Sequence, residues 1–387
     1  MGQIFRFFLI FACFTAFSPA LAAPPIDTPA REAIVIEAQT GAVLFAKDPD
    51  VTMHPASMSK LMTLYLVFER LKEGSLKLDD TLPVSEKAWR MGGSKMFVKV
   101  GTRVPVEELI QGVIVDSGND ACIVLAEGLA GSEAYFAQLM TDKARELGMT
   151  TSTFVNATGW PDPEHVMTVR ELAILALHII RDFPEYYPYF KERSFTYGVS
   201  PDGKPIKQYN RNVLVFRNSG VDGLKTGHTE SAGYGLTASA IRNGRRLVAV
   251  VAGLPSDKAR ANEAERLLDW GFRNFNTYAL FKKGQRVEQA LVWLGTDPAV
   301  NLIMPRDVVL TLSRRARQGL KVRLSYDAPI PAPIAKGAPL ATLTISAPEM
   351  KPLKIPLLAD HAVDGLGPLG KLGAAFRYLV WGASSGS

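Results

Sequence analysis

The stretch from Ser57 to Lys72, SMSKLMTLYLVFERLK, decides how the rest of the chain is interpreted. Its apolar residues cover most of a helix circumference, which is typical of a helix buried at the centre of a domain. These residues are Leu61, Met62, Leu64, Tyr65, Val67, Phe68 and Leu71. If the helix begins at Ser57, the Ser57 hydroxyl and the Lys60 amine lie on one face of its first turn.

This hydroxyl and amine have the chemistry of an activated nucleophile. The positive potential and free amides of a helix N-terminus stabilise an oxyanion and favour a deprotonated hydroxyl. Burial lowers the pKa of a lysine, and a neutral Lys60 accepts the proton of Ser57. A Ser-x-x-Lys match is expected about once by chance in a chain of this length, with the serine as a helix cap and the lysine solvated. The pair alone therefore leaves both interpretations open.

Two further triplets add to the pair. Ser117-Gly118-Asn119 supplies a second hydroxyl for proton relay and an amide able to hold a substrate carbonyl. Lys225-Thr226-Gly227 supplies a cation, a hydroxyl and a glycine that allows close approach of a substrate backbone. The second triplet precedes a predicted hairpin over 234–253, so we expect it on an edge strand where an extended peptide adds as another strand. Each triplet alone is typical of a turn or a strand end.

The three motifs in this order resemble the signature of penicillin-binding proteins and serine β-lactamases. Longer runs are similar to the low-molecular-mass D-alanyl-D-alanine carboxypeptidases, and they lie at 53–63 (MHPASMSKLMT), 117–121 (SGNDA) and 221–235 (VDGLKTGHTESAGYG). Trp270-Gly271-Phe272 is similar to the helix that closes their catalytic domain. The resemblance extends from Ala33 to Phe275, and more loosely beyond.

The resemblance implies an α/β (α+β) fold of the β-lactamase/transpeptidase type. A helical cluster and a five-stranded antiparallel sheet are expected, with the active site between them. A small all-β domain is expected to follow, because short β-like runs separated by Pro and Gly clusters begin near Asn276.

The family also implies roles for individual residues. Ser57 is expected to be the nucleophile, Lys60 its base, and Ser117 with Lys225 a relay to the leaving amine. The backbone amides of Ser57 and His228 are expected to form the oxyanion hole.

The remaining implied residues bind substrate. Asn119 is expected to hold a substrate amide, and Gly227 to allow the substrate backbone to approach. Thr226, Thr229 and Arg260 are expected to receive the terminal carboxylate.

The activity implied is removal of the terminal D-alanine from peptidoglycan pentapeptide stems through an acyl-Ser57 intermediate. Penicillin and other β-lactams would acylate the same serine as covalent inhibitors. A serine β-lactamase, a D,D-endopeptidase and a non-catalytic wall-binding protein remain as alternatives.

Three other features have structural interpretations. The imidazole of His228 is expected to pack rather than relay protons. Glu164 and His165 are interpreted as loop-capping groups, because the asparagine expected after a class A β-lactamase glutamate is absent. The segment 91–94 is either a flap bordering the site or a plain surface loop.

Composition narrows the possible partners. The chain has 387 residues, 47% of them hydrophobic and 21% charged, and a formal net charge of +6. These values are typical of a globular protein with two or three domains. The basic residues form no long run, so nucleic acid is not expected as a partner. Neither a Cys-x-x-Cys pair nor a His-Glu-x-x-His helix occurs, so no metal or other cofactor is expected.

Both ends of the chain indicate an exported protein. Arg6, an apolar run over 7–17 and Ala20-Leu21-Ala22 predict a signal peptide over 1–22, with cleavage after Ala22 or Ala23. Removal of Cys13 with it leaves Cys122 alone, so no internal disulfide is expected. Near the C-terminus, apolar residues recur at helical spacing and predict an amphipathic segment on the inner-membrane surface of the periplasm. They are Leu366, Leu369, Leu372, Phe376, Leu379 and Val380. A helix docked on its own domain is the alternative.

The predicted organisation is a signal peptide (1–22), a catalytic domain (23–275), a β-rich domain (276–362) and the amphipathic segment (363–387). Hairpins are predicted over 32–46 and 234–253, the second turning at Asn243-Gly244. Helices are predicted over 106–128, 132–147, 169–181 and 263–275. Strands are predicted over 308–312, 322–326 and 341–345.

Overall fold

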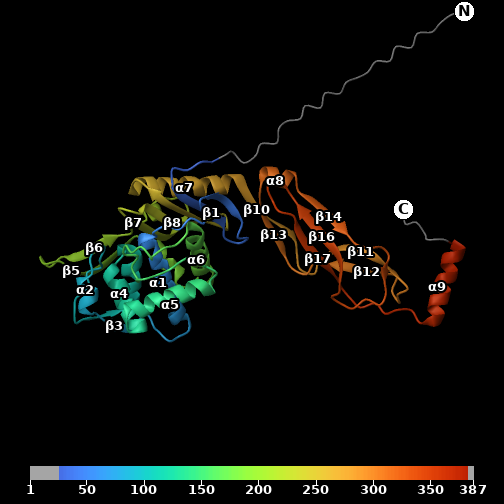
Figure 1. Ribbon diagram of the computed structural model, residues 1–387, viewed down its shortest axis with the longest axis horizontal. Coiled ribbons are helices and arrows are strands. Elements are labelled where there is room, and N and C mark those ends of the chain that lie inside the picture. Colours follow the sequence, from blue (N-terminus) through green and yellow to red (C-terminus); the bar gives the residue numbers. More distant parts are fainter. Residues whose placement is uncertain (1–25, 382–387) are drawn as a thin grey trace, which may run out of the picture.

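The computed structural model describes residues 26–381. The predicted signal peptide and the last residues of the chain, 382–387, lie outside this range. Figure 1 shows a large mixed N-terminal part, an elongated β-rich part and a C-terminal helix beyond it. The described residues include no helix that is both long enough and apolar enough to cross a membrane.

A five-stranded antiparallel sheet forms the centre of the N-terminal part, with strand order β2-β1-β9-β8-β7. Its strands are β1 (Glu32–Glu37), β2 (Val43–Lys47), β7 (Val221–Thr229), β8 (Gly233–Arg242) and β9 (Arg245–Leu254). The predicted sheet and both predicted hairpins are confirmed. Asn243 and Gly244 have φ values of 51° and 76°, the left-handed conformation that a tight two-residue hairpin turn requires. The Lys225 triplet lies on β7 at the sheet edge, as predicted.

Helices cover both faces of this sheet. One face contacts the cluster of α1 (Lys60–Lys72), α4 (Asn119–Ala130), α5 (Glu133–Glu146) and α6 (Val169–Asp182). The other face contacts α7 (Asp257–Asn274). Successive strand residues alternate between the two cores, because side chains along a strand point to opposite faces. Ile34 packs with the helical cluster, whereas Val35 packs with Leu267 and Leu268 of α7.

The helical prediction over 106–128 is confirmed in part, because the helix is interrupted at Ser117. The chain forms α3 (Val106–Gln111), a wider turn η2 (Gly112–Asp116), a left-handed residue at Ser117 and then α4. Ser117 has φ 60°. The carboxylate of Asp120 accepts hydrogen bonds from the backbone N–H groups of Met96, Phe97 and Val98. These contacts bind the start of α4 to a distant loop, and hydrophobic periodicity does not report such contacts.

Helix α7 begins earlier than predicted, at Asp257 instead of Glu263. The Ser256 hydroxyl accepts a hydrogen bond from the Ala259 N–H at 3.1 Å, which is an N-cap. The first residues of the helix are mostly polar, so apolar periodicity alone places its start too late. The helices predicted over 132–147 and 169–181 are confirmed, with Ser132 and Thr168 as their caps.

Short elements complete the N-terminal part. They are η1 (Ala56–Ser59), β3 (Thr81–Pro83), α2 (Glu86–Arg90), β4 (Arg103–Pro105), η3 (Tyr187–Lys191), β5 (Ser194–Val199), β6 (Pro205–Tyr209) and η4 (Val213–Phe216).

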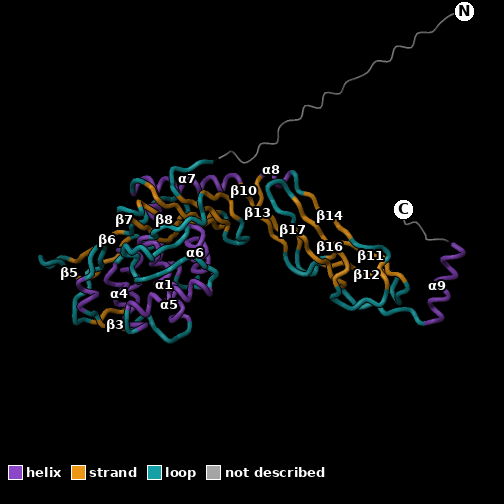
Figure 2. The backbone as a smooth tube through the Cα atoms, viewed as in Figure 1, coloured by secondary structure: helices purple, strands orange, loops and turns teal. Residues whose placement is uncertain are grey.

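The β-rich part contains a six-stranded sheet of order β14-β16-β17-β12-β11-β15 and a separate pair β10-β13. Its strands are β10 (Phe275–Phe281), β11 (Arg286–Trp293), β12 (Ala299–Ile303), β13 (Val308–Ser313), β14 (Lys321–Ser325), β15 (Ile330–Pro331), β16 (Pro339–Ser346) and β17 (Leu353–Ala359). The three predicted strands are present, but the part is not purely β, because Arg314–Gln318 forms the short helix α8. Figure 2 shows its backbone as predominantly strand and loop.

The C-terminal helix α9 (Pro368–Trp381) extends away from the β-rich part in both views (Figures 1 and 2). The side chains of Leu369 and Leu372 are 86% and 69% exposed. An apolar surface of this kind is typical of a helix that lies on another surface.

Candidate active site

The three predicted motifs meet between the helical cluster and the edge strand β7. Ser57 lies in the tight turn η1, which leads directly into α1, and Lys60 is the first residue of α1. The Ser57 hydroxyl is therefore at the start of the central helix, as predicted, although in a 3₁₀ turn. The backbone of η1 faces Gly227 of β7. A Cβ at position 227 would lie 2.7 Å from the Pro55 carbonyl oxygen. The close approach of η1 to β7 therefore requires glycine at this position.

Lys60 is in contact with the Ser57 hydroxyl. Its Nζ lies 2.7 Å from Ser57 Oγ and donates to the Thr158 carbonyl oxygen at 2.5 Å. The lysine is 0% exposed. Its pKa is lowered from 10.5 to about 8, mainly by burial, and the charge of Arg211 acts in the same direction. A neutral amine in this position has a lone pair available for the Ser57 proton.

Lys225 and Ser117 form a second pair. Lys225 Nζ donates to Ser117 Oγ at 2.9 Å, and both residues are almost fully buried. Burial holds the pKa of Lys225 well below 10.5, and the charges of Lys60, Arg211 and Arg260 add to this effect. The left-handed backbone of Ser117 directs its hydroxyl to this contact.

Asn119 binds the loop over 91–94. Its Nδ2 donates to the Gly92 carbonyl oxygen at 2.9 Å, and its backbone N–H donates to the Ser94 carbonyl oxygen at 2.7 Å. A Cβ at Gly93 would lie 2.8 Å from Asn119 Nδ2, so the loop approaches closely only because position 93 is glycine. The segment 91–94 therefore borders the site, which agrees with its interpretation as a flap and not with that of a plain surface loop.

A hollow of about 420 Å³, called the Ser57 hollow below, contains most of the expected residues. It is lined by Ser57, Ser94, Ser117, Arg211, Val213, Thr226, Gly227, His228, Tyr234, Asp257 and Arg260. Lys60 and Lys225 lie behind this lining and contact its two serines. Asn119 and Thr229 are not part of the lining. The Thr229 hydroxyl accepts a hydrogen bond from the Ala232 N–H at 3.0 Å, within the turn to β8.

Arg260 reaches the hollow from α7 but is already paired. Its Nη1 donates to the Gly227 carbonyl oxygen at 3.0 Å, and its Nη2 forms an ion pair with Asp257. Its guanidinium also lies over the Tyr234 ring. The His228 imidazole stacks on the same ring, with 3.8 Å between the ring centroids. This contact agrees with the packing interpretation of the imidazole.

Sequence reasoning missed several residues that line the hollow, above all Arg211. Arg211 lies in the segment between β6 and η4, and its Nη1 donates to Ser94 Oγ at 2.6 Å. No local pattern marks this arginine, because only tertiary contacts bring it to the site. Thr158 was also missed, although its carbonyl oxygen orients Lys60.

Glu164 and His165 have structural contacts. The Glu164 N–H donates to Asp162 Oδ1 at 2.8 Å, and the Val155 N–H donates to His165 Nδ1 at 3.4 Å. Burial lowers the pKa of His165 to about 4. A neutral imidazole buried in its loop agrees with the predicted loop role.

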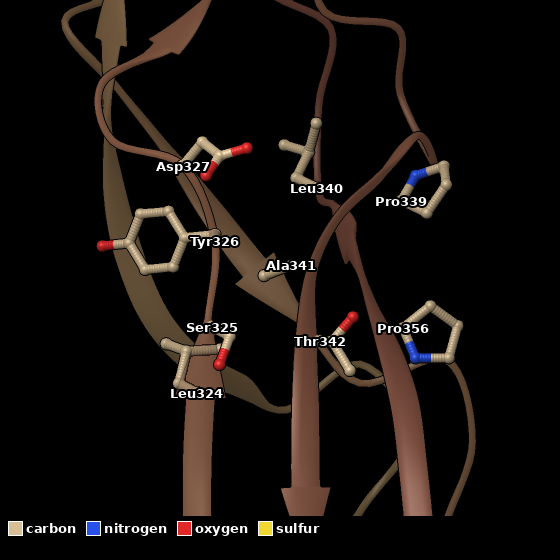
Figure 3. A pocket seen from close by; sticks show the side chains of 9 residues that line it. All are labelled: Leu324, Ser325, Tyr326, Asp327, Pro339, Leu340, Ala341, Thr342 and Pro356. Atoms are coloured by element: carbon tan, nitrogen blue, oxygen red, sulfur yellow. The ribbon is translucent and has the colours of Figure 1, made fainter.

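A second hollow, of about 680 Å³, lies in the β-rich part (Figure 3). It is lined by Leu324, Ser325, Tyr326, Asp327, Pro339, Leu340, Ala341, Thr342 and Pro356. None of the motif residues is among them. Among the described residues, no cluster of His, Cys, Asp and Glu side chains could hold a metal ion.

Comparisons with known proteins agree with the geometry. The family model described as D-alanyl-D-alanine carboxypeptidase matches residues 18–256, and the model described as penicillin-binding protein 5, C-terminal domain, matches residues 275–364. The D-alanyl-D-alanine carboxypeptidase DacA of Haemophilus influenzae is 38% identical over 320 residues, which cover 81% of this chain and 80% of that protein.

Solved structures are similar as well. The crystal structure of penicillin-binding protein 5 from Haemophilus influenzae has a TM-score of 0.77 and 35% identity, covering 88% of this chain and 99% of that one. Penicillin-binding protein D2 from Listeria monocytogenes, in its ampicillin-bound form, has a TM-score of 0.57 and 30% identity. That match covers 64% of this chain and 100% of the other.

Proposed function

The chain belongs to the D-alanyl-D-alanine carboxypeptidase family, and we propose that Ser57 and Lys60 are the nucleophile and base of its serine-type reaction. The observation that carries this assignment is the 2.7 Å contact between Lys60 Nζ and Ser57 Oγ, with the lysine fully buried. The proposed substrate is a peptidoglycan stem peptide that ends in two D-alanines. The products are free D-alanine and the shortened stem.

Acylation begins with proton transfer from Ser57 to Lys60. With a pKa of about 8, about one tenth of the Lys60 side chains are neutral at pH 7 and able to accept the proton. Ser57 Oγ attacks the carbonyl carbon between the two D-alanines, and the resulting oxyanion accepts hydrogen bonds from the backbone amides of Ser57 and His228. Substrate is bound as an extended segment beside β7, with Asn119 holding its amide.

Release of D-alanine requires a proton on the leaving amine. Ser117 and Lys225, 2.9 Å apart, are the proposed relay that passes the proton of Lys60 to this amine, which leaves Lys60 neutral for the next step. Water then attacks the acyl carbonyl, Lys60 accepts a proton from it, and Ser57 leaves with its hydroxyl restored.

A β-lactam would follow the same path as far as the acyl-enzyme. The family resemblance and the ampicillin-bound relative support covalent binding at Ser57. Hydrolysis of the acyl-enzyme should be slower than in a class A β-lactamase, because the loop that carries Glu164 and His165 is bound within itself and adds no second deacylating base to Lys60.

We also propose export to the periplasm and attachment to the inner membrane. The apolar run and small-residue site before Ala23 support export. The exposed leucines of α9 support binding to a lipid surface without a membrane span.

Mass spectrometry of the mature protein after penicillin treatment tests the proposal. One penicillin should add to the protein, and peptide mapping should place it on Ser57. Ser57→Ala should remain unmodified, whereas Ser75→Ala, which removes an exposed hydroxyl outside the site, should be labelled normally. Label on another residue would reject the nucleophile.

The same preparation separates the alternatives. A stable adduct supports a carboxypeptidase, whereas rapid hydrolysis of penicillin would indicate a β-lactamase. Release of D-alanine distinguishes a carboxypeptidase from an endopeptidase, which would cut cross-linked peptides. Absence of both label and products would support a non-catalytic wall-binding protein.

A further inference from the structure

The net charge of the chain is divided unevenly between its two parts. Residues 276–364 contain 12 Lys and Arg against 7 Asp and Glu, a net charge of +5. Residues 26–275 contain 29 Lys and Arg against 31 Asp and Glu, a net charge of −2. The β-rich part, although the smaller, therefore accounts for the positive charge, and neither the proposed reaction nor the binding of α9 to lipid makes use of it.

Seven of these basic residues gather at one end of the six-stranded sheet, and they are called the basic cluster below. Three lie on α8, two on the edge strand β14, and two on or beside β17. A Cβ at Gly319 would lie 2.7 Å from Pro348 Cδ, so the loop between β16 and β17 packs closely against the segment between α8 and β14. The basic cluster consists of Arg314, Arg315, Arg317, Lys321, Arg323, Lys351 and Lys354, all of them exposed.

The register of the sheet carries the basic cluster across three strands. Arg323 of β14 lies opposite Thr344 of β16, and Thr344 lies opposite Lys354 of β17. These three residues form a row on the outer face, because side chains alternate along a strand and the neighbouring Leu343 is buried in the core. Within residues 26–381, Glu349 is the only carboxylate at ion-pair distance from any member of the cluster. The cluster therefore presents positive charge that the fold itself does not neutralise.

The hollow of Figure 3 adjoins this row. Ser325, Thr342 and Pro356 line the hollow, and each lies two residues along its strand from a member of the row. Residues two apart on a strand share a face, so the hollow and the basic cluster form one continuous surface. Hydroxyls and the Tyr326 ring offer polar and apolar contacts to a ligand there, and of the lining residues only Asp327 is charged.

The position of the basic cluster favours a polymer of the cell wall over lipid as its partner. Ser313, which precedes α8, pairs with Phe275, which follows α7, so α8 lies at the end of the β-rich part next to the N-terminal part. Helix α9 extends from the opposite end (Figure 1). A protein bound to lipid through α9 therefore holds the cluster away from the headgroups, and charge attraction in salt falls off within about 10 Å.

We propose that the basic cluster is a second binding site for peptidoglycan, which holds the polymer by the carboxylates of its stem peptides while Ser57 acts on a stem end. This inference rests on the proposed function. Two contacts with one polymer raise the effective concentration of stem ends at the active site. A surface of one charge sign also speeds the encounter with a partner of the opposite sign. Cleavage of a small soluble peptide requires neither effect.

The test measures how much of the mature protein sediments with purified, lipid-free, insoluble peptidoglycan. Penicillin is added beforehand, so that Ser57 is acylated and the active site contributes no binding. The same measurement is made with peptidoglycan whose carboxylates have been converted to amides, and with vesicles that contain phosphatidylglycerol. Release of D-alanine from a small soluble peptide is measured separately, without penicillin.

Two triple variants are compared with the wild type. The cluster variant removes three charges of the basic cluster, and it is Lys321→Gln/Arg323→Gln/Lys354→Gln. The matched control removes three exposed charges before and at the start of β11, on the far side of the same sheet from β14. It is Lys282→Gln/Lys283→Gln/Arg286→Gln.

At low salt, the cluster variant should bind peptidoglycan about 3- to 100-fold more weakly than the wild type, because three exposed charge pairs that each contribute modestly are lost. The difference should shrink as the salt concentration rises. Amidated peptidoglycan should bind the wild type as weakly as it binds the cluster variant. The control should bind like the wild type, and all three proteins should release D-alanine from the small peptide at the same rate, which also shows that the variants are folded.

Equal binding of peptidoglycan by the wild type and the cluster variant would overturn the inference, as would undiminished binding of the wild type to amidated peptidoglycan. A cluster variant that loses binding to the vesicles but keeps binding to peptidoglycan would make lipid the partner and overturn it too. If the wild type releases no D-alanine from the small peptide, the proposed function itself fails. Because that readout does not involve the cluster, the two failures are distinguishable.

Discussion

Replacing Lys60 by methionine should abolish acylation, and its effect on stability should be more favourable at neutral pH than at high pH. The lysine is 0% exposed, and burial lowers its pKa from 10.5 to about 8. Between these two values the unfolded chain binds more protons than the folded protein, so the stability of the wild-type protein rises with pH in that window. The folded state therefore pays to bury an amine that water would keep protonated over this whole window.

The magnitude follows from the two pKa values. At pH 7, a lowering of this size costs the folded protein about 3 kcal/mol, and at pH 10 about 1 kcal/mol. Methionine has a similar length and no charge, so Lys60→Met removes this cost. It also leaves the buried Thr158 carbonyl oxygen without its donor, which costs about 1–3 kcal/mol at any pH. The effect of the substitution on stability should therefore be about 2 kcal/mol more favourable at pH 7 than at pH 10.

Urea unfolding of both proteins at pH 7 and pH 10 measures this difference, with penicillin labelling as the readout of acylation. Lys72→Met is a control, because Lys72 is an exposed lysine on the same helix. Its effect on stability should not depend on pH in this way. If Lys60→Met is equally destabilising at both pH values, the pKa of Lys60 is not lowered in the folded protein and our reasoning about the base is refuted.

Four further predictions follow from the structure of the site and of α9. The rate of acylation by penicillin should rise about 10-fold between pH 7 and pH 9, with a midpoint near 8 set by Lys60; a rate that is flat over this range would contradict the assignment. In Arg211→Gln the same midpoint should move to higher pH, because the charge of Arg211 lowers the pKa of Lys60; stopped-flow measurement of acylation that finds an unchanged or lower midpoint would count against this coupling. Gly227→Ala should cost about 2 kcal/mol or more and impair acylation, since its Cβ would lie 2.7 Å from the Pro55 carbonyl oxygen; thermal unfolding that matches the wild type would show that η1 can move aside. Deletion of residues 367–387 should release the protein from inner-membrane vesicles without lowering cleavage of a soluble peptide; unchanged partitioning in a flotation assay would reject α9 as the attachment site.

The parts of the fold that the sequence predicts well are those with local signals. The Asn243-Gly244 turn and the alternation around it define β8 and β9, and the apolar circumference after Lys60 defines α1. Caps at Ser132 and Thr168 explain why α5 and α6 start where predicted. The break at Ser117 could not be read in the same way, because it lies beside Asp120, whose carboxylate binds the distant backbone of 96–98.

The residues of the site also divide into those that a sequence signal marks and those that only tertiary contacts bring together. Ser57 and Lys60 are three residues apart, so helical geometry alone brings them together. Ser117 and Lys225 are 108 residues apart, and only the family resemblance indicated that they meet. Neither helical spacing nor the family resemblance marked Arg211. It reaches the hollow because Asn210 and Asn212 anchor its segment to the residues after α6 and to β7, and such contacts require the folded structure.

The protonation state of Lys60 can be measured directly by NMR. The ¹³Cε signal of Lys60, assigned by its loss in Lys60→Met, is followed between pH 6 and pH 12 in the unliganded protein. We predict a titration midpoint near 8, which leaves the amine able to accept the Ser57 proton. A midpoint above about 10, the range of an ordinary solvated lysine, would contradict the mechanism.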